Sequence, residues 1–238
     1  MRVGAATDTG RVRKVNEDAY WYDDRLLIVA DGMGGHAAGE VAANVALNAA
    51  RQAIAALEPR VLPVEEMVRQ AVAAANLEVY ERSLRVPGLQ GMGTTLTLVW
   101  IAGDRAVVGH VGDSRAYLVT KSGMVQLTQD HSVVAELVRS GGLQASEARL
   151  HPYRNVLTRA LGAAPQVEAD VNSVRVEPGE ALLLCTDGLT AVLQDEEIHK
   201  TLVEMDDPTR CAQRLVDLAN ARGGPDNITA VVALMEAS

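Results

Sequence analysis

Two apolar runs of the sequence end in the same dipeptide, Asp-Gly. The first is LLIVADG, which ends in Asp31 and Gly32, and the second is LLLCTDG, which ends in Asp187 and its glycine. A carboxylate at the end of a core strand lies at the rim of a sheet, and a glycine beside it lets the backbone approach a bound group closely. Asp31 and Asp187 are therefore predicted to stand at strand ends, where they can bind a cation.

Further carboxylates stand beside other apolar runs. Asp113 lies in the turn of VVGHVGDSRAYLV, Asp226 precedes the run of GGPDNITAVVAL, and RVRKVNEDAY contributes Glu17 and Asp18. Carboxylates gathered at one rim repel one another unless cations neutralise them, and an all-oxygen ligand set suits Mg²⁺ or Mn²⁺. An aspartate in a turn is most often only a turn former, but the repeated pattern favours a metal site. The spacing matches neither an EF-hand nor a P-loop.

The elements that must position these carboxylates follow from the hydrophobic periodicity. Gly39 to Leu57 is an Ala-rich predicted helix, Pro63 opens a second one, and the period changes to two from Thr94 onward. Consecutive short strands favour antiparallel pairing over a repeated βαβ unit, and hence an α+β fold with two sheets covered by helices. The predicted strands are 26–30, 94–100, 106–111, 115–120, 124–127, 171–176, 181–185 and 228–234, and a last helix lies between Asp207-Pro208 and Gly223-Gly224.

Composition limits the class of protein. The 238 residues, 48% of them hydrophobic, are enough for one domain with a sizeable core. A net charge of −9 argues against a nucleic-acid partner, although metals could supply positive charge for a phosphorylated substrate. Without a signal-like N-terminus or an apolar run of membrane-spanning length, we expect a cytoplasmic protein. Cys185 and Cys211 are expected to be buried free thiols.

Seven short motifs are spread along nearly the whole chain: RxxxED (13–18), ADGMGGH (30–36), GMGTTL (91–96), VGDSRAY (111–117), LTQDHS (127–132), CTDGL (185–189) and GGPDNIT (223–229). With these motifs the sequence resembles the bacterial metal-dependent serine/threonine protein phosphatases of type 2C. The resemblance implies a four-layer αββα sandwich, two antiparallel sheets flanked by helix pairs, with the metal site at one edge. It also implies one catalytic domain (1–238) with a flap-like excursion around 140–165.

The resemblance implies hydrolysis of phosphoserine and phosphothreonine in proteins by a metal-activated water. Asp31 would bridge two core Mg²⁺ or Mn²⁺ ions, with the Gly32 carbonyl on one of them, and Asp187 and Asp226 would complete the other. Two ions that share a carboxylate lower the pKa of a bridging water and neutralise phosphate charge. The implied partners are phosphorylated proteins such as bacterial serine/threonine kinases and their targets, whose signalling the enzyme would reverse.

The remaining carboxylates have less direct implied roles. Glu17 and Asp18 would act mainly through metal-bound waters. Asp113 would hold a third, weaker ion together with Asp187, and Asp130 is an alternative ligand for that ion.

The implied catalytic residues are Arg13, Asp18 and His36. Arg13 would orient the substrate phosphate with its guanidinium fork. Met33 stands where many eukaryotic relatives have a histidine that serves as general acid, and His36 could contribute through water or serve only a structural hydrogen bond. His110, inside a strand, is expected to be structural, and His131 receives no role.

Two other classes of function remain open at this stage. A non-catalytic phosphoprotein-binding regulator on the same fold would be expected to have lost metal aspartates, and this chain keeps them. A two-metal phosphodiesterase or nuclease is disfavoured by the acidic charge. Hydrolysis of p-nitrophenyl phosphate, but not of its bis ester, would separate the phosphatase from both.

Overall fold

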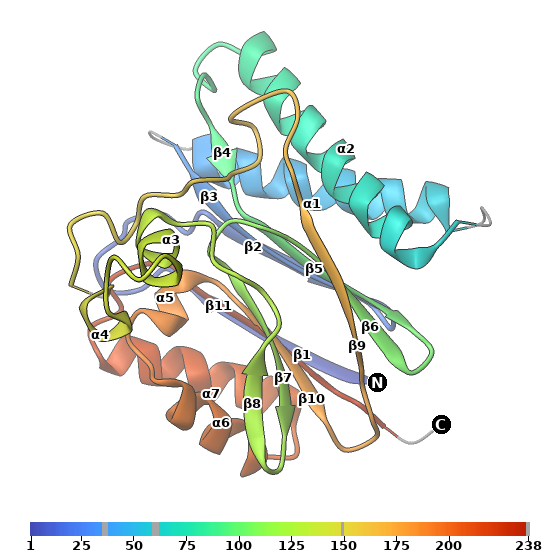
Figure 1. The fold of residues 1–238 in the computed structure, drawn as a ribbon, viewed down its shortest axis with the longest axis vertical. Helices are drawn as coiled ribbons and strands as arrows, with labels where there is room; N and C mark the ends of the chain where they lie inside the picture. The colour runs from blue at the N-terminus through green and yellow to red at the C-terminus, as the bar shows by residue number, and fades with distance from the viewer. Residues whose placement is uncertain (35–37, 59–61, 149, 237–238) are drawn as a thin grey trace.

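Two antiparallel sheets lie face to face, and helices cover the outer face of each (Figure 1). The structure is a computed structural model that describes residues 1–34, 38–58, 62–148 and 150–236. The resulting order of layers is helix, sheet, sheet, helix, which confirms the predicted four-layer α+β sandwich.

The first sheet combines the two ends of the chain with its middle, in the order β1-β11-β10-β7-β8. Its N-terminal strand β1 pairs with the C-terminal strand β11 along their full lengths. Its strands are β1 (Arg2–Asp8), β11 (Ile228–Leu234), β10 (Ala181–Cys185), β7 (Arg115–Thr120) and β8 (Gly123–Gln126).

The second sheet has the order β2-β3-β5-β6-β9, and a short strand, β4, pairs with the end of β3. All of its neighbouring strands are antiparallel, as predicted from the run of short strands. Its strands are β2 (Asp18–Tyr22), β3 (Leu26–Met33), β4 (Gly93–Thr94), β5 (Leu96–Ala102), β6 (Arg105–Val111) and β9 (Asp170–Arg175).

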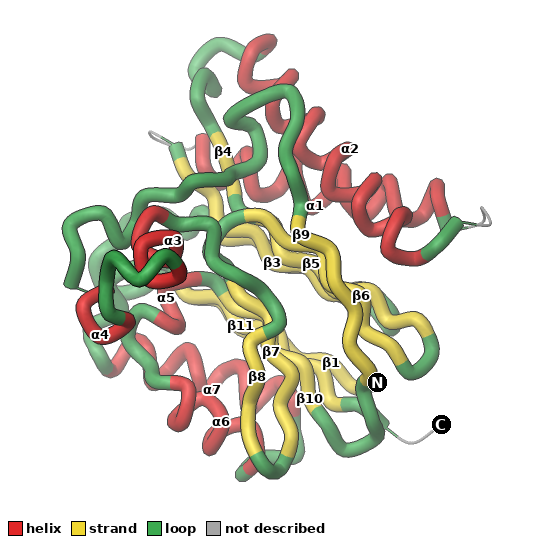
Figure 2. Tube along the Cα trace, viewed as in Figure 1, coloured by secondary structure: helices red, strands yellow, loops and turns green. Residues whose placement is uncertain are grey.

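One helix pair covers each sheet (Figure 2). α1 (Ala38–Leu57) and α2 (Val64–Arg85) pack on the second sheet, whereas α6 (Asp195–Val203) and α7 (Pro208–Ala221) pack on the first. Small buried side chains on α1, among them Ala42 and Ala46, let this helix approach the sheet closely. Asp207 caps α7 by accepting a hydrogen bond from the Arg210 amide.

The layers divide the apolar interior into three clusters, of which the central one lies between the two sheets. Leu27 and Val29 of β3 meet Leu182 and Leu184 of β10 in this central cluster. The opposite face of each sheet packs on its helices, so both faces of β5 are buried along nearly the whole strand. The sequence of β5, LTLVWIA, has a single threonine and agrees with burial on both faces.

Several elements were not predicted. β1 and β2 precede the first predicted strand, and the segment between β8 and β9 contains two short helices, α3 (Val133–Arg139) and α4 (Ala145–Ala148), joined by loops. Both cysteines are free and buried, as expected. Within the described part of the chain, no helix combines the length and the apolar character that a membrane span requires.

Candidate metal centre

The pairing of β2 with β3 brings the first carboxylates together. Asp18 lies directly opposite Asp31 in this register, and the Gly32 amide donates to the Glu17 carbonyl at 3.2 Å. The backbone of Asp31 is fixed on its other side, where its amide donates to Thr95 Oγ1 at 2.9 Å. The N-terminal acidic pair is thus anchored beside the first Asp-Gly by sheet hydrogen bonding.

Gly32 is required by close packing at this strand end. A Cβ atom at this position would stand 2.1 Å from the carbonyl oxygen of Gly39 and 2.7 Å from that of Glu17. No side chain fits there, because real Cβ atoms do not approach backbone oxygens this closely. The glycine therefore lets the start of α1 pack against the end of β3 beside Asp31.

The first sheet supplies two more aspartates from neighbouring strands. Asp187 begins the one-turn helix α5 (Asp187–Thr190) directly after β10, and Asp226 precedes β11, which pairs with β10. The Asp226 carboxylate accepts from the Asn227 amide at 2.8 Å and from Arg13 Nη2 at 2.8 Å. Carboxylates from both sheets therefore occupy the same rim of the sandwich.

Asp113 reaches the rim from the turn after β6. Gly112, before it, has φ of +112°, and a Cβ there would stand 2.5 Å from the Thr95 side chain. Ser114, after it, is fully buried and hydrogen-bonds through its hydroxyl to Thr95 Oγ1 at 2.8 Å. Because Thr95 also binds the Asp31 backbone, one buried threonine fixes both the Asp113 turn and the end of β3.

The carboxylates of the cluster are buried and close enough to repel one another when ionised. Burial, and then the charges of neighbouring carboxylates, raise the pKa values of Asp31 and Asp113 well above their usual range. Burial likewise raises the pKa of Asp18 to about 7 and that of Asp187 to about 6. A group of acids that cannot all ionise together is one whose ionised form a divalent cation would stabilise.

Unpartnered oxygens give a second, independent test of a metal's fit. Among the described residues, five buried side-chain nitrogen or oxygen atoms have no hydrogen-bond partner, and three of them are Glu17 Oε1, Asp18 Oδ1 and Asp187 Oδ1. Leaving a buried polar atom unpaired is costly, so their concentration at one rim indicates a ligand. Hard oxygen donors of this kind fit Mg²⁺ or Mn²⁺.

Side chains alone do not form a complete metal-binding group among the described residues. Among the residues that the structure describes, no three His, Cys, Asp or Glu side chains form a ready-made metal group. The Asp226 carboxylate lies in an ion pair with Arg13. Mg²⁺ usually keeps several water ligands and takes only a few carboxylates, and backbone carbonyls such as that of Gly32 are available as well.

The other predicted site residues have different surroundings. Arg13 is half exposed, and its hydrogen bond to Asp226 raises its pKa. Asp130 is held by Arg115, which donates to both of its carboxylate oxygens at 2.7–3.1 Å, so it is less available to a metal than Asp113. His36 lies outside the described residues.

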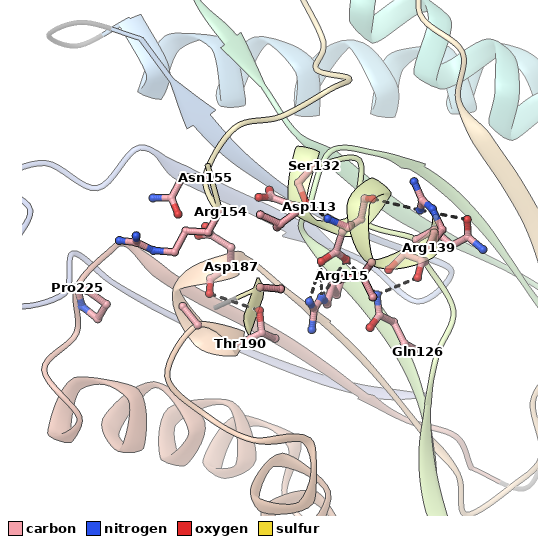
Figure 3. A pocket seen from close by; sticks show the side chains of 18 residues that line it. Asp113, Arg115, Gln126, Ser132, Arg139, Arg154, Asn155, Asp187, Thr190 and Pro225 are labelled. Carbon is pink, nitrogen blue, oxygen red and sulfur yellow. Dashed lines mark hydrogen bonds and ion pairs between the residues drawn. The ribbon is translucent and has the colours of Figure 1, made fainter. Parts of the chain in front are cut away.

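A cavity of about 600 Å³ opens beside the cluster (Figure 3). Asp113 and Asp187 lie in its wall, together with apolar side chains of α3 such as Val134 and Val138. Arg154, from the loop that follows α4, also lines it. The rim thus has space for a substrate larger than a phosphate group, with both apolar and cationic contacts.

Sequence reasoning missed the residues that hold the carboxylates in place. Thr186 and Thr229 both donate to Asp18 Oδ2, at 2.8 and 2.7 Å, which leaves Oδ1 as the unpartnered oxygen. Asn227 accepts from the Glu17 amide at 2.9 Å and donates to the Thr9 and Val15 carbonyls. All three lie within the quoted CTDGL and GGPDNIT motifs, which was the signal available to find them.

The chain is similar to known proteins over almost its full length. Residues 11–219 match the family described as Protein phosphatase 2C. Serine/threonine protein phosphatase PstP of Mycobacterium tuberculosis is 40% identical over 236 residues, which are 98% of this chain and 45% of that protein. The chain therefore spans slightly under half of the length of this relative.

Other relatives match from end to end. Serine/threonine phosphatase stp of Listeria innocua is 38% identical over 241 residues, covering 98% of this chain and 95% of that protein. The crystal structure of the catalytic domain of PstP in complex with two manganese ions superposes with a TM-score of 0.86 at 38% identity, covering 97% of this chain and 96% of that one.

Proposed function

The chain belongs to the protein phosphatase 2C family, and we propose that it hydrolyses phosphoserine and phosphothreonine in proteins with Mg²⁺ or Mn²⁺ held by the aspartate cluster. The observation that carries the proposal is the convergence of carboxylates from both sheets, with three buried oxygens unpartnered among the described residues. Neither cysteine offers an alternative nucleophile, because both are buried and burial raises their thiol pKa values.

The core ions are assigned to the residues that face one another across the rim. Asp31 would be the residue shared by both ions, an assignment supported by its position: the charges of Asp18, Asp187, Asp113 and Asp226 all act on its carboxylate. The Gly32 carbonyl would help to hold one ion, and Asp187 and Asp226 would help to hold the other. When bound, the ions would activate a water and neutralise the charge of the phosphate.

The protein groups around the ions position water and substrate. Thr186 and Thr229 hold Asp18 Oδ2, so that Asp18 Oδ1 is free to orient a water, and Glu17 acts in the same way through its unpartnered oxygen. Arg13 leaves Asp226 to bind the substrate phosphate through its guanidinium, since a guanidinium matches phosphate geometry. His36 stays a proposed contributor to protonation of the leaving alcohol on the resemblance alone.

A third, weaker ion is assigned to Asp113 with Asp187. Burial contributes most to the raised pKa of Asp113, and Asp187 is the charge that contributes next. Asp130 is the poorer ligand because Arg115 already occupies both of its oxygens.

The substrates are phosphorylated proteins, and we include bacterial serine/threonine kinases and their targets among them. The relatives' names support phosphoprotein substrates. We also propose that the chain acts in the cytoplasm as a single catalytic domain. The excursion between β8 and β9 would serve as its flap, because this segment lines the cavity beside Asp113 and Asp187.

The test is a phosphopeptide assay with manganese, with chelator, and with the Asp31→Asn variant. Manganese-dependent release of phosphate by the wild type, absent with chelator and in the variant, is expected. p-Nitrophenyl phosphate should be hydrolysed and its bis ester should not. Tight phosphopeptide binding without turnover would favour the non-catalytic regulator instead, and hydrolysis of the bis ester would favour a phosphodiesterase.

A further inference from the structure

His131 clamps the residue that precedes Asp113. Its backbone amide donates to the Gly112 carbonyl at 2.7 Å, and its ring Nδ1 accepts from the Gly112 amide at 3.1 Å. Both backbone groups of Gly112 are therefore satisfied by one residue, which is 2% exposed. Because Gly112 already has a positive φ in a tight space beside Thr95, the clamp holds the Asp113 turn in a conformation with little freedom.

The hydrogen bonds determine which tautomer His131 adopts. A backbone amide can only donate, so Nδ1 must carry a lone pair, and the proton of the neutral ring must stand on Nε2. Nε2 lies 3.1 Å from Asp170 Oδ2, at the start of β9, and donates to it. Arg159 Nη1 is also 3.2 Å from Nε2, but two donors cannot bond to each other. Arg159 Nη1 instead donates to Asp170 Oδ1, at 2.9 Å.

His131 also stands at the base of the excursion that lines the cavity. Its carbonyl accepts from the Thr158 amide at 2.9 Å, and Ser132 and Leu157 form the next bridge. These contacts join the two ends of the segment 132–157, which contains α3 and α4. The same residue thus contacts the Asp113 turn on one side and the base of the excursion on the other.

We propose that His131 is a positioning residue for Asp113: its Nδ1, oriented through Nε2 by Asp170, holds the Gly112 amide so that the Asp113 carboxylate can bind the weak third ion. The inference rests on the proposed function, because that ion is part of it. The interaction is not an ordinary core contact, since His131 bonds directly to the backbone one residue from the proposed ligand.

Two amide variants, each of which mimics one ring nitrogen, separate the two ends of the ring. In His131→Asn the amide oxygen stands close to where Nδ1 stood, so it can still accept from Gly112, while the bond to Asp170 is lost. In His131→Gln the amide nitrogen can replace Nε2 as donor to Asp170, but no acceptor remains for Gly112. The two variants therefore share the loss of the ring and differ in which contact survives.

The first measurement uses the metal-free protein and monitors hydrogen exchange of the Gly112 amide. We expect exchange to accelerate about tenfold or more in His131→Gln and to stay near the wild-type rate in His131→Asn, since the exchange rate reports whether the amide is hydrogen-bonded. Thermal unfolding of both variants, compared with wild type, identifies any general loss of structure.

The second measurement is calorimetric titration with Mn²⁺, followed by phosphopeptide kinetics at saturating metal. We expect His131→Gln to weaken the third site about tenfold while the core sites keep their affinity, and to lower kcat more than it raises KM. His131→Asn should restore most of the third-site affinity. The proposal is overturned if the two variants bind Mn²⁺ equally, or if Gly112 exchange rises in His131→Gln with no change in the third site.

The wild-type data separate this inference from the proposed function. A wild type that binds only two Mn²⁺ ions removes the site that His131 would position, and overturns the inference even if phosphopeptides are hydrolysed. A wild type with a third site that follows the expected variant pattern, but without phosphopeptide hydrolysis, supports the positioning role and overturns the proposed function instead.

Discussion

Replacing Arg13 with alanine tests how the substrate phosphate is bound. Arg13 Nη2 lies 2.8 Å from Asp226 Oδ2, and the arginine side chain is 49% exposed. An ion pair this exposed contributes less than about 1 kcal/mol to stability, because water screens it. Arg13→Ala should therefore unfold at nearly the wild-type temperature.

The expected effect on catalysis is much larger than the effect on stability. A charge-assisted hydrogen bond to phosphate contributes about 1.5–3 kcal/mol, so kcat/KM for a phosphopeptide should fall by roughly one to two orders of magnitude. Metal binding should be retained, and at the Asp226 site it should tighten slightly, because Arg13 no longer competes for that carboxylate.

The assay is steady-state hydrolysis of a phosphopeptide at saturating manganese, paired with calorimetric titration of the metal. Lys14→Ala is the matched control: it removes a neighbouring exposed cation that makes no ion pair among the described residues. Arg13→Lys keeps the charge but not the planar fork, and should recover only part of the loss.

Two results would refute this reasoning. If Lys14→Ala lowers kcat/KM as much as Arg13→Ala, the effect is a general one of local positive charge. If Arg13→Ala has wild-type kinetics, Arg13 is only the surface partner of Asp226.

Three further predictions concern the carboxylates. Asp31→Asn and Asp187→Asn should each abolish manganese-dependent hydrolysis while circular dichroism stays native; activity within a few-fold of wild type would remove them from the site. Asp113→Ala should bind two Mn²⁺ ions and lose most phosphopeptide activity. If calorimetry finds as many metal sites as in the wild type and turnover is undiminished, Asp113 only forms the turn. Since the folded pKa of Asp18 is raised to about 7, the stability linked to its proton is lost as pH rises through that value. In chelator, the free energy of unfolding should therefore be lower at pH 8 than at pH 5 by roughly 1 kcal/mol or more, which lowers the melting temperature by about 2–4 °C. Mn²⁺ at pH 8 should restore the melting temperature. Equal melting temperatures at the two pH values in chelator would contradict this prediction.

Local patterns in the sequence were sufficient to locate the carboxylates that lie at strand ends. Asp31 and Asp187 follow apolar runs whose burial and extended conformation are decided by their own composition, and both runs are core strands. The two long helices were predictable for the same reason, because their apolar residues recur with the helical period. The layered α+β class follows from the order of these elements.

Short elements gave no such pattern. β2 carries Asp18, but its sequence DAYWY is brief and begins with an acid, and it becomes a strand because it pairs with β3. A neighbouring strand supplied by the tertiary fold thus overrode the weak local signal of β2.

The contacts that turn six carboxylates into one site were decided by the tertiary structure alone. Thr186 and Thr229 reach Asp18 from 168 and 211 residues away in sequence, and Arg13 reaches Asp226 across 213. Composition and spacing cannot specify such contacts, because they depend on which strands become neighbours and in which register. The sequence alone determined which residues are proposed to carry the chemistry. The pairing of the two sheets decided which of their oxygens are held, which are left unpartnered among the described residues and which face one another.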